Sequence, residues 1–298
     1  SINLIDIFHL TFQNSYYNKN IIYILGTCFI SFSLLIKMGA SLFFFFFFLI
    51  YDGISFSVLI FLNIFPKIIY LLILFNFVNS FNLFYLSLIV KTFIISSLLI
   101  GLLGALSEVR TKRFLVFTSI YNLSFFSIPF WNLNISFIGI FIFFSSVYLL
   151  NFFIFMILFS NLRDMRTNII SKNLIDLYEI KAQNPKLGWL FIFFSFFSSG
   201  LPLTIIFMTK FSFFFEFSRL TYIIALIYFL FLSSLSLFYY LRIIKMITQG
   251  TLYPNILIQP ICLVSSLLYS SVIWFNLYTI IFLDKILLLL NYFLINVI

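Results

Sequence analysis

The chain has 298 residues, of which 63% are hydrophobic and only 8% are charged, and its mean hydropathy is +1.19. No soluble domain could bury so much apolar surface, so these values exclude a soluble protein and indicate one that spans a membrane. The net charge of +9 would suggest nucleic-acid binding in a soluble protein, but here the basic residues are scattered singly between apolar stretches and are expected to set membrane topology.

Continuous apolar runs separated by short polar breaks predict about eight transmembrane helices in a single domain of residues 1–298. A helix needs about 20 apolar residues to cross the hydrocarbon core. The predicted spans are 21–48, 55–79, 81–106, 114–129, 135–160, 187–216, 220–243 and 260–283. The predicted fold class is therefore an all-α integral membrane protein.

Loop charges predict which of the segments between the helices share one side of the membrane. The segments 49–54, 107–113, 161–186 and 244–259 together carry a positive excess, whereas the charges of the other loops cancel. Since positively charged loops stay on the side of synthesis, these four segments are expected to face the cytoplasm or the mitochondrial matrix.

Two groups of polar residues near helix ends are interpreted as interfacial. Glu216 and Arg219 are expected to form an ion pair at the membrane surface. An aromatic belt with basic anchors is expected from Tyr239, Tyr240, Arg242 and Lys245. The two cysteines, Cys28 and Cys262, and the single His9 are too few and too far apart for a metal, haem or iron–sulfur site, so no bound cofactor is expected.

Four lysines, Lys37, Lys67, Lys91 and Lys210, fall inside apolar spans. A charged side chain at the centre of a membrane helix costs roughly 2.5 to 3.5 kcal/mol. A lysine that is tolerated there usually faces a wet or paired interior, where burial favours the neutral amine and makes proton exchange accessible. The alternative is that the long side chain reaches the headgroups by snorkelling.

Helix breakers distinguish two of these lysines. Pro66 precedes Lys67 in the middle of a span, and proline removes a backbone hydrogen bond. Gly200 and Pro202 interrupt the span of Lys210, so a discontinuous helix is predicted there. Broken helices at membrane depth are typical of ion pathways.

Four blocks of sequence occur in the order and at the spacing of a known family. They are Lys37 to Ala40 with Tyr51 to Gly53 and Phe65 to Ile68; Leu103 to Leu106 with Lys112 to Leu115 and Thr118 to Ile120; Gly200 to Pro202 with Phe207, Lys210 and Phe211; and Tyr239 to Lys245. In this order they resemble the chain 2 family of the proton-pumping NADH:ubiquinone oxidoreductase, respiratory complex I, whose members are antiporter-like subunits.

The resemblance implies a membrane-arm subunit that couples NADH-to-ubiquinone electron transfer to proton pumping. Lys37, Lys67 and Lys210 would form the proton relay, with Lys91 as an additional candidate. The chain itself would carry no redox centre, because NADH, FMN, the iron–sulfur clusters and ubiquinone bind elsewhere in the complex. The abundance of phenylalanine, 48 residues, suggests an A/T-rich, organellar gene and hence the mitochondrial inner membrane.

Other functions remain open from the residues alone. One alternative is another antiporter-like paralogue, such as chain 4 or 5 of the same complex or a subunit of a cation/proton antiporter. Another is a membrane scaffold that transports nothing. Lys210 argues against chain 4, whose members tend to carry glutamate at that position, and the Tyr51-Asp52-Gly53 turn favours chain 2.

The chain departs from the family pattern at several points, among them Phe46 to Phe48, which replace a Trp-x-Pro segment. Leu42, Phe43 and Phe44 replace a Pro-Phe-His segment, and Asn122 stands where the family has a histidine. The resemblance also begins at the seventh helix of the family, so the first six helices and the glutamate that pairs with the first lysine are missing. Either the chain is truncated or those helices belong to a separate polypeptide, and we expect a separate polypeptide that also supplies an acidic residue near Lys37.

Overall fold

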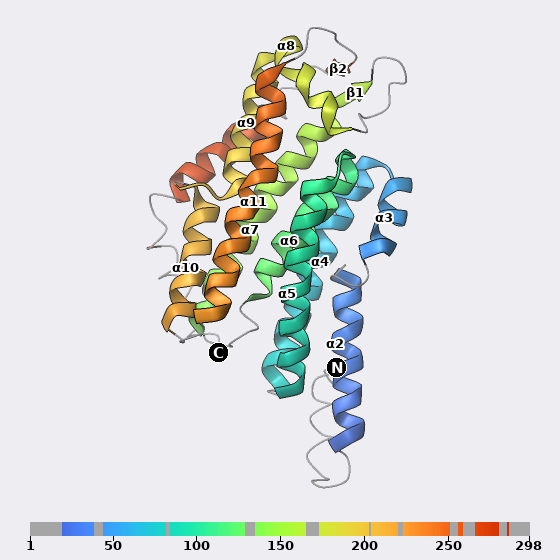
Figure 1. The fold of residues 1–298 in the computed structure, drawn as a ribbon, viewed down its shortest axis with the longest axis vertical. Coiled ribbons are helices and arrows are strands. Elements are labelled where there is room, and N and C mark those ends of the chain that lie inside the picture. The colour runs from blue at the N-terminus through green and yellow to red at the C-terminus, as the bar shows by residue number, and fades with distance from the viewer. Residues whose placement is uncertain are drawn as a thin grey trace.

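The structure, a computed structural model, describes residues 20–38, 44–81, 84–128, 135–164, 173–202, 204–219, 223–250, 256–258, 266–279 and 285. In this part the chain forms an elongated bundle of helices (Figure 1). The helices are α2 (Asn20–Met38), α3 (Phe44–Gly53), α4 (Phe56–Phe81), α5 (Phe84–Ser107), α6 (Thr111–Phe126), α7 (Ile135–Ser160), α8 (Ile180–Gln183), α9 (Pro185–Ser199), α10 (Ile205–Arg219) and α11 (Ile223–Gln249). A further helix covers 266–279.

Helix lengths and apolar composition agree with a membrane protein. Two described segments, Val90–Ser107 in α5 and Ile223–Gln249 in α11, are long and apolar enough to cross a membrane. Helices α4 and α7 have 26 residues each. At a rise of about 1.5 Å per residue each is about 39 Å long, which exceeds the roughly 30 Å thickness of the hydrocarbon core. The predicted all-α membrane fold is confirmed.

One predicted span is wrong in its connectivity. The run 21–48 was expected to form one helix, but α2 ends at Met38 and α3 begins at Phe44. Residues 39–43 between them lie outside the described residues. A hydropathy average over a sliding window detects the apolar run but does not detect the separation of α2 and α3. The phenylalanines at the start of α3 keep the average hydropathy high.

The predicted break in the span 187–216 is confirmed. Helix α9 ends at Ser199, and Gly200 follows in the left-handed conformation with φ of 73°. A residue with a Cβ is strained in that region, so glycine is the natural helix terminator here. Helix α10 then begins at Ile205. The other predicted spans from 55 to 243 each correspond to one helix.

Helices α5 and α6 approach closely because two glycines of α5 face α6. A Cβ built at Gly101 would lie 2.7 Å from the backbone nitrogen of Tyr121, and one at Gly104 would overlap the ring of Phe117. Small residues allow such close packing between membrane helices, where dispersion and shape replace the hydrophobic effect. The result fixes α6 in the middle of the bundle, beside α5 and α11 (Figure 1).

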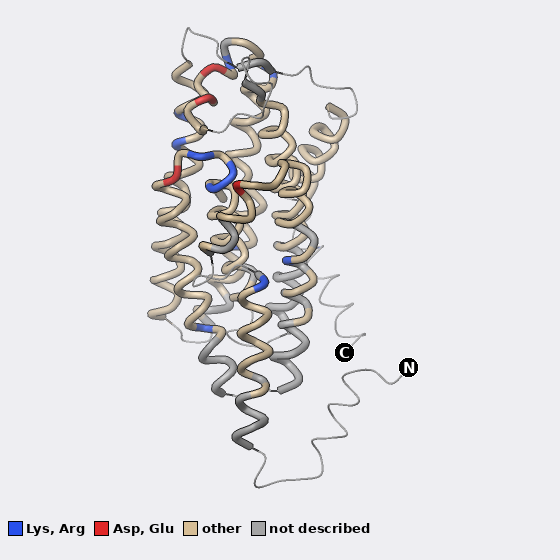
Figure 2. The backbone as a smooth tube through the Cα atoms, turned by 90° about the vertical axis from the view of Figure 1, so that its right-hand side faces the viewer, with Lys and Arg blue, Asp and Glu red and all other residues tan. Residues whose placement is uncertain are grey.

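Charged residues gather toward one end of the bundle, the upper end in Figure 2. Arg113 donates to the carboxylate of Asp52 at 2.6 Å, and Lys112 Nζ donates to the carbonyl of Ile54 at 2.6 Å. Arg242 donates to the carbonyls of Leu106, Ala105 and Glu108 at 2.6, 3.0 and 2.9 Å, which satisfies the open C-terminus of α5. These contacts join the segments around 49–54 and 107–113.

The other two segments of the predicted positive side reach the same end. Strand β1 (Leu162–Asp164) pairs antiparallel with β2 (Ile256–Ile258). The backbone nitrogen of Leu174, the first residue of the 3₁₀-helix η3 (Leu174–Glu179), donates to the carbonyl of Val109 at 2.7 Å. The four segments therefore share one end, as predicted. Which compartment that end faces stays a prediction.

Candidate functional site

Lys67 lies in the middle of α4 and is buried, with 5% of its surface exposed. Its ammonium donates to Oδ1 of Asn63 at 2.9 Å and to Oγ of Ser119 at 2.8 Å. Asn63 lies one turn earlier on the same face of α4, and Ser119 belongs to α6. Helix α4 continues through Pro66, so the proline does not end the helix.

The hydroxyl of Ser119 is positioned by its own helix. It donates to the carbonyl of Val116 at 2.7 Å, which leaves an oxygen lone pair for the Lys67 ammonium. Among the described residues no carboxylate pairs with Lys67, and both of its hydrogen-bond partners are neutral. An amide oxygen and a hydroxyl can also bind a neutral amine, since the hydroxyl can turn and donate. The site can therefore hold either protonation state.

Lys210 lies in the second turn of α10 and is buried, with 4% exposed. Its Nζ sits over the rings of Phe125 and Tyr121 at 5.0 and 5.7 Å from their centroids, which are cation–π distances. A Cβ at Gly200 would lie 3.4 Å from this Nζ. The ammonium is thus close to the C-terminal end of α9, where the helix dipole favours a cation.

Helix α6 separates the two lysines. Ser119, which contacts Lys67, and Tyr121, which contacts Lys210, are two residues apart in this helix. Since consecutive residues turn by about 100°, their side chains point to roughly opposite faces. The phenol of Tyr121 donates to the carbonyl of Leu232 in α11 at 3.2 Å. One helix therefore carries a partner of each buried lysine.

Further buried polar groups lie on α6, α9 and α11. Nδ2 of Asn122 donates to the carbonyl of Thr118 at 2.7 Å, the Ser198 hydroxyl donates to the carbonyl of Phe194 at 2.8 Å, and Tyr240 is 3% exposed. Asn122 stands where the resembled family has a histidine. An amide can accept and donate hydrogen bonds but does not titrate in the physiological range, so it can orient neighbours without storing a proton.

The tyrosines of α11 are not an interfacial belt, and that expectation is wrong. Tyr239 and Tyr240 are 0% and 3% exposed, and Tyr239 packs edge-on against the rings of Phe114 and Tyr121. Their proximity in sequence to basic residues suggested a surface position, but the helix turn directs them into the core. Lys245 is exposed, as a basic anchor would be, and Arg242 caps α5 instead.

Two other predicted relay lysines lie outside this core. Lys37 is exposed in the last turn of α2, with its Nζ 5.7 Å from the ring centroid of Tyr70. Lys91 is half-buried in α5. The structure therefore brings Lys67 and Lys210 against the same helix, and Lys37 to the surface of this chain. The side chains of Glu216 and Arg219, with His9 and Cys262, lie outside what the structure describes.

Sequence reasoning missed the partners of the buried lysines. Asn63 could have been found, because a polar residue four positions before Lys67 shares its helical face. Ser119 is 52 residues away from Lys67 in the sequence. Tyr121 and Phe125 are also remote from Lys210, the lysine that they contact. Nothing in a single sequence distinguishes such residues from ordinary packing.

Comparison with known proteins gives one family and several solved relatives. The model of the family described as NADH:quinone oxidoreductase/Mrp antiporter, TM, matches residues 2–236. A chain of respiratory complex I from Thermus thermophilus with bound aureothin is 19% identical, with a TM-score of 0.71, and the alignment covers 85% of this chain and 56% of that chain. A comparison with curated proteins gives no significant match.

A second similar fold comes from the Mrp complex of Dietzia sp. DQ12-45-1b. It is 14% identical with a TM-score of 0.73, and the alignment covers 90% of this chain and 58% of that chain. At these identities the likeness concerns the fold. This chain spans somewhat more than half the length of the chains it matches in the two structures.

Proposed function

Because the chain belongs to the NADH:quinone oxidoreductase/Mrp antiporter transmembrane family, we propose that it is a proton-translocating, antiporter-like subunit in the membrane arm of respiratory complex I, of the chain 2 type. The observation that carries this proposal is the pair of buried lysines, Lys67 and Lys210, which contact opposite faces of α6. Neither has an acidic partner among the described residues.

The partners of these lysines suit proton transfer. A cation balanced by a carboxylate is held firmly, whereas amide, hydroxyl and ring partners compensate the charge less. A charge that moves nearby can then change which lysine is protonated. Moving one charge across 100 mV costs about 2.3 kcal/mol, and leaving a lysine charged at the helix centre costs about the same, so the two energies are comparable.

The chemistry of the whole assembly would be shared among subunits. This chain would be a multi-pass subunit of the mitochondrial inner membrane that transfers protons. The complex as a whole would act as an H⁺-translocating NADH:ubiquinone reductase. NADH, FMN, iron–sulfur clusters and ubiquinone would bind to other subunits. Lys37 and Lys91 stay candidate members of the relay beside Lys67 and Lys210.

We further propose that a separate polypeptide packs against α2 and provides an acidic residue near Lys37. The support is the exposure of Lys37 and of Phe29, which is 73% exposed on the same helix. A lysine left against lipid costs several kcal/mol, more than the contact of Lys37 with the Tyr70 ring, worth about 0.5 to 1 kcal/mol at an exposed site, can offset. Cross-linking from a cysteine placed at Ser33, an exposed residue one turn before Lys37, tests this. Adducts with lipid alone would contradict it.

A second candidate function is a subunit of an Mrp-type cation/proton antiporter. The observation in its favour is the match to the Mrp complex structure, whose TM-score equals that of the complex I match within 0.02. The two candidates differ in their partners, since complex I contains flavin and iron–sulfur subunits. The mass and partner list of the purified assembly decides between them.

The test of proton transfer is Lys67→Ala in sealed vesicles that contain the assembly. Proton uptake, measured with a pH-sensitive dye, should fall relative to NADH oxidation while the assembly keeps its size. The matched control is Lys245→Ala, which removes an exposed lysine at the charged end. Normal pumping in an intact assembly would favour a scaffold that transports nothing.

A further inference from the structure

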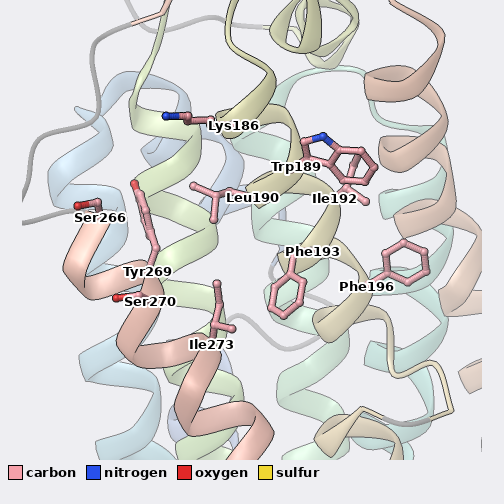
Figure 3. Close-up of a pocket in the computed structure, with 10 residues that line it drawn as sticks. All are labelled: Lys186, Trp189, Leu190, Ile192, Phe193, Phe196, Ser266, Tyr269, Ser270 and Ile273. Carbon is pink, nitrogen blue, oxygen red and sulfur yellow. The ribbon is translucent and has the colours of Figure 1, made fainter.

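An open groove lies between α9 and the helix 266–279, apart from the two lysine sites. It encloses about 700 Å³, within the roughly 300 to 1,000 Å³ of small-molecule sites. Figure 3 shows Lys186 at its upper end, with Trp189, Phe193, Phe196 and Ile273 further along it. Apart from the lysine and two serines of the 266–279 helix, the residues along it are apolar or aromatic.

One end of this groove is positively charged. Lys186 is exposed in the first turn of α9, and Lys181 holds its Nζ over the ring of Trp189 at 5.4 Å from the centroid. The N-terminus of α9 adds the positive end of its dipole. Among the described residues, no ion pair involves Lys186. This end belongs to the end of the bundle at which charged residues gather (Figure 2), which we expect to lie at the level of the lipid headgroups.

The length of the groove matches one membrane leaflet. From Lys186 to Phe196 the helix advances about 15 Å at 1.5 Å per residue, which is half of the roughly 30 Å hydrocarbon core. A transmembrane helix from another subunit would need a groove along both leaflets. One acyl chain needs a single leaflet and an apolar channel that begins at the headgroups.

We propose that this groove binds one anionic phospholipid, with its phosphate at Lys186 and one acyl chain along Trp189, Phe193 and Ile273. With the phosphate at Lys186, the ring of Trp189, which is 62% exposed, would lie at the headgroup boundary, where tryptophan is favoured. Basic residues on the cytoplasmic or matrix side select anionic headgroups over zwitterionic ones. The proposal depends on the membrane location of the chain and is independent of its role in proton transfer.

The test uses the whole assembly in nanodiscs of phosphatidylcholine with a minor fraction of phosphatidylglycerol that carries a diazirine in its acyl chain. After illumination, peptide mass spectrometry should find adducts on α9 between Trp189 and Phe196. Lys186→Gln should lower them about fivefold, the factor that corresponds to about 1 kcal/mol per basic residue near the surface. Lys186→Arg should keep them. Lys245→Gln, which changes an exposed lysine outside the groove, should also keep them.

Two results would overturn the proposal. Equal labelling by diazirine-phosphatidylcholine, unaffected by Lys186→Gln, would mean that the groove does not select an anionic headgroup. Labelling of Ile224 on α11, which is 87% exposed, without any in the groove would mean that another polypeptide covers it. If the Lys186→Gln variant fails to assemble, Ile273→Trp is the alternative test, because the larger side chain fills the groove. Adducts on Phe193 that stay unchanged in Ile273→Trp would exclude an acyl chain in the groove.

Discussion

Lys67 and Lys210 are buried to nearly the same degree, 5% and 4% exposed, but their ammonium groups have different kinds of partner. Lys67 lies in the continuous helix α4 and donates hydrogen bonds to Asn63 and Ser119. Lys210 lies just after a helix break and faces the rings of Phe125 and Tyr121. The protein therefore uses two solutions for a lysine inside the membrane.

The two solutions respond differently to the loss of a proton. An amide oxygen and a hydroxyl can hydrogen-bond a neutral amine as well as an ammonium, so Lys67 keeps its partners in both states. The attraction between a cation and an aromatic face is electrostatic and disappears with the charge. A neutral Lys210 would therefore lose its main attraction to the two rings and become free to turn. We infer that Lys67 is the fixed member of the pair and Lys210 the one that moves.

The largest effect is expected from Lys67→Arg. The guanidinium keeps the positive charge but cannot be deprotonated in proteins, so a residue that must exchange protons loses its function. A positioned proton-transfer group contributes about 10² to 10⁴-fold, and we expect proton uptake per NADH oxidised in sealed vesicles to fall at least about a hundredfold. Pumping that survives in Lys67→Arg but is lost in Lys67→Met would show that only the charge matters.

The next effect is expected at the rings of the Lys210 site. Phe125→Leu removes the closer ring and should weaken the attraction by about 2 kcal/mol, the value for a desolvated cation–π pair. Tyr121→Phe keeps its ring and loses one hydrogen bond to Leu232, worth about 1 kcal/mol. Thermal stability and pumping of the assembly should both fall more in Phe125→Leu than in Tyr121→Phe.

The control for Phe125→Leu is a buried phenylalanine away from both lysines. Phe159 is 1% exposed and packs against Phe155 and Phe191, so Phe159→Leu creates a comparable cavity without touching a cation. Equal losses of pumping in the two variants would assign the effect of Phe125 to packing alone.

The sequence predicted the burial of Lys67 and Lys210, the break at Gly200 and the approximate spans, because each depends on composition or on a single helix breaker. It could not predict which other side chains face the interior. Helix α7, for example, is apolar around nearly all of its circumference, so its sequence carries no amphipathic face that would orient it. Tyr239 and Tyr240 illustrate this limit: they were assigned to the surface, and tertiary packing buries them.

A smaller effect is expected from Gly200→Ala, which changes only the Lys210 site. Alanine at φ of 73° costs about 1 to 2 kcal/mol, and its Cβ would lie 3.4 Å from both Lys210 Nζ and a methyl group of Ile206. The thermal midpoint and pumping should fall together. Gly26→Ala in α2 is the matched control, because nothing lies within 4 Å of its added Cβ and alanine favours the helix. A similar loss of thermal stability and pumping in both variants would mean that the helix break at Gly200 has no special role.

The smallest effect is expected from Ser119→Ala, which removes one of two hydrogen bonds to Lys67. The remaining bond to Asn63 should hold the amine in place, so the loss should be about 1 kcal/mol, or about fivefold in pumping. The sharper measurement combines this change with Phe125→Leu. Ser119 and Phe125 belong to the same helix but serve different lysines, and the effects of independent sites add within about 0.5 kcal/mol.

Additive losses in the double variant would mean that α6 separates two independent proton sites. A deviation of more than about 0.5 kcal/mol would mean that the two sites are coupled, either through α6 or because protons pass both lysines in series. We expect additivity in thermal stability, because the two side chains contact different helices. We expect a deviation in pumping, because a proton that crosses the subunit must use both lysines, and the slower transfer then limits the rate in either single variant. Additivity in both measurements would contradict a relay through Lys67 and Lys210.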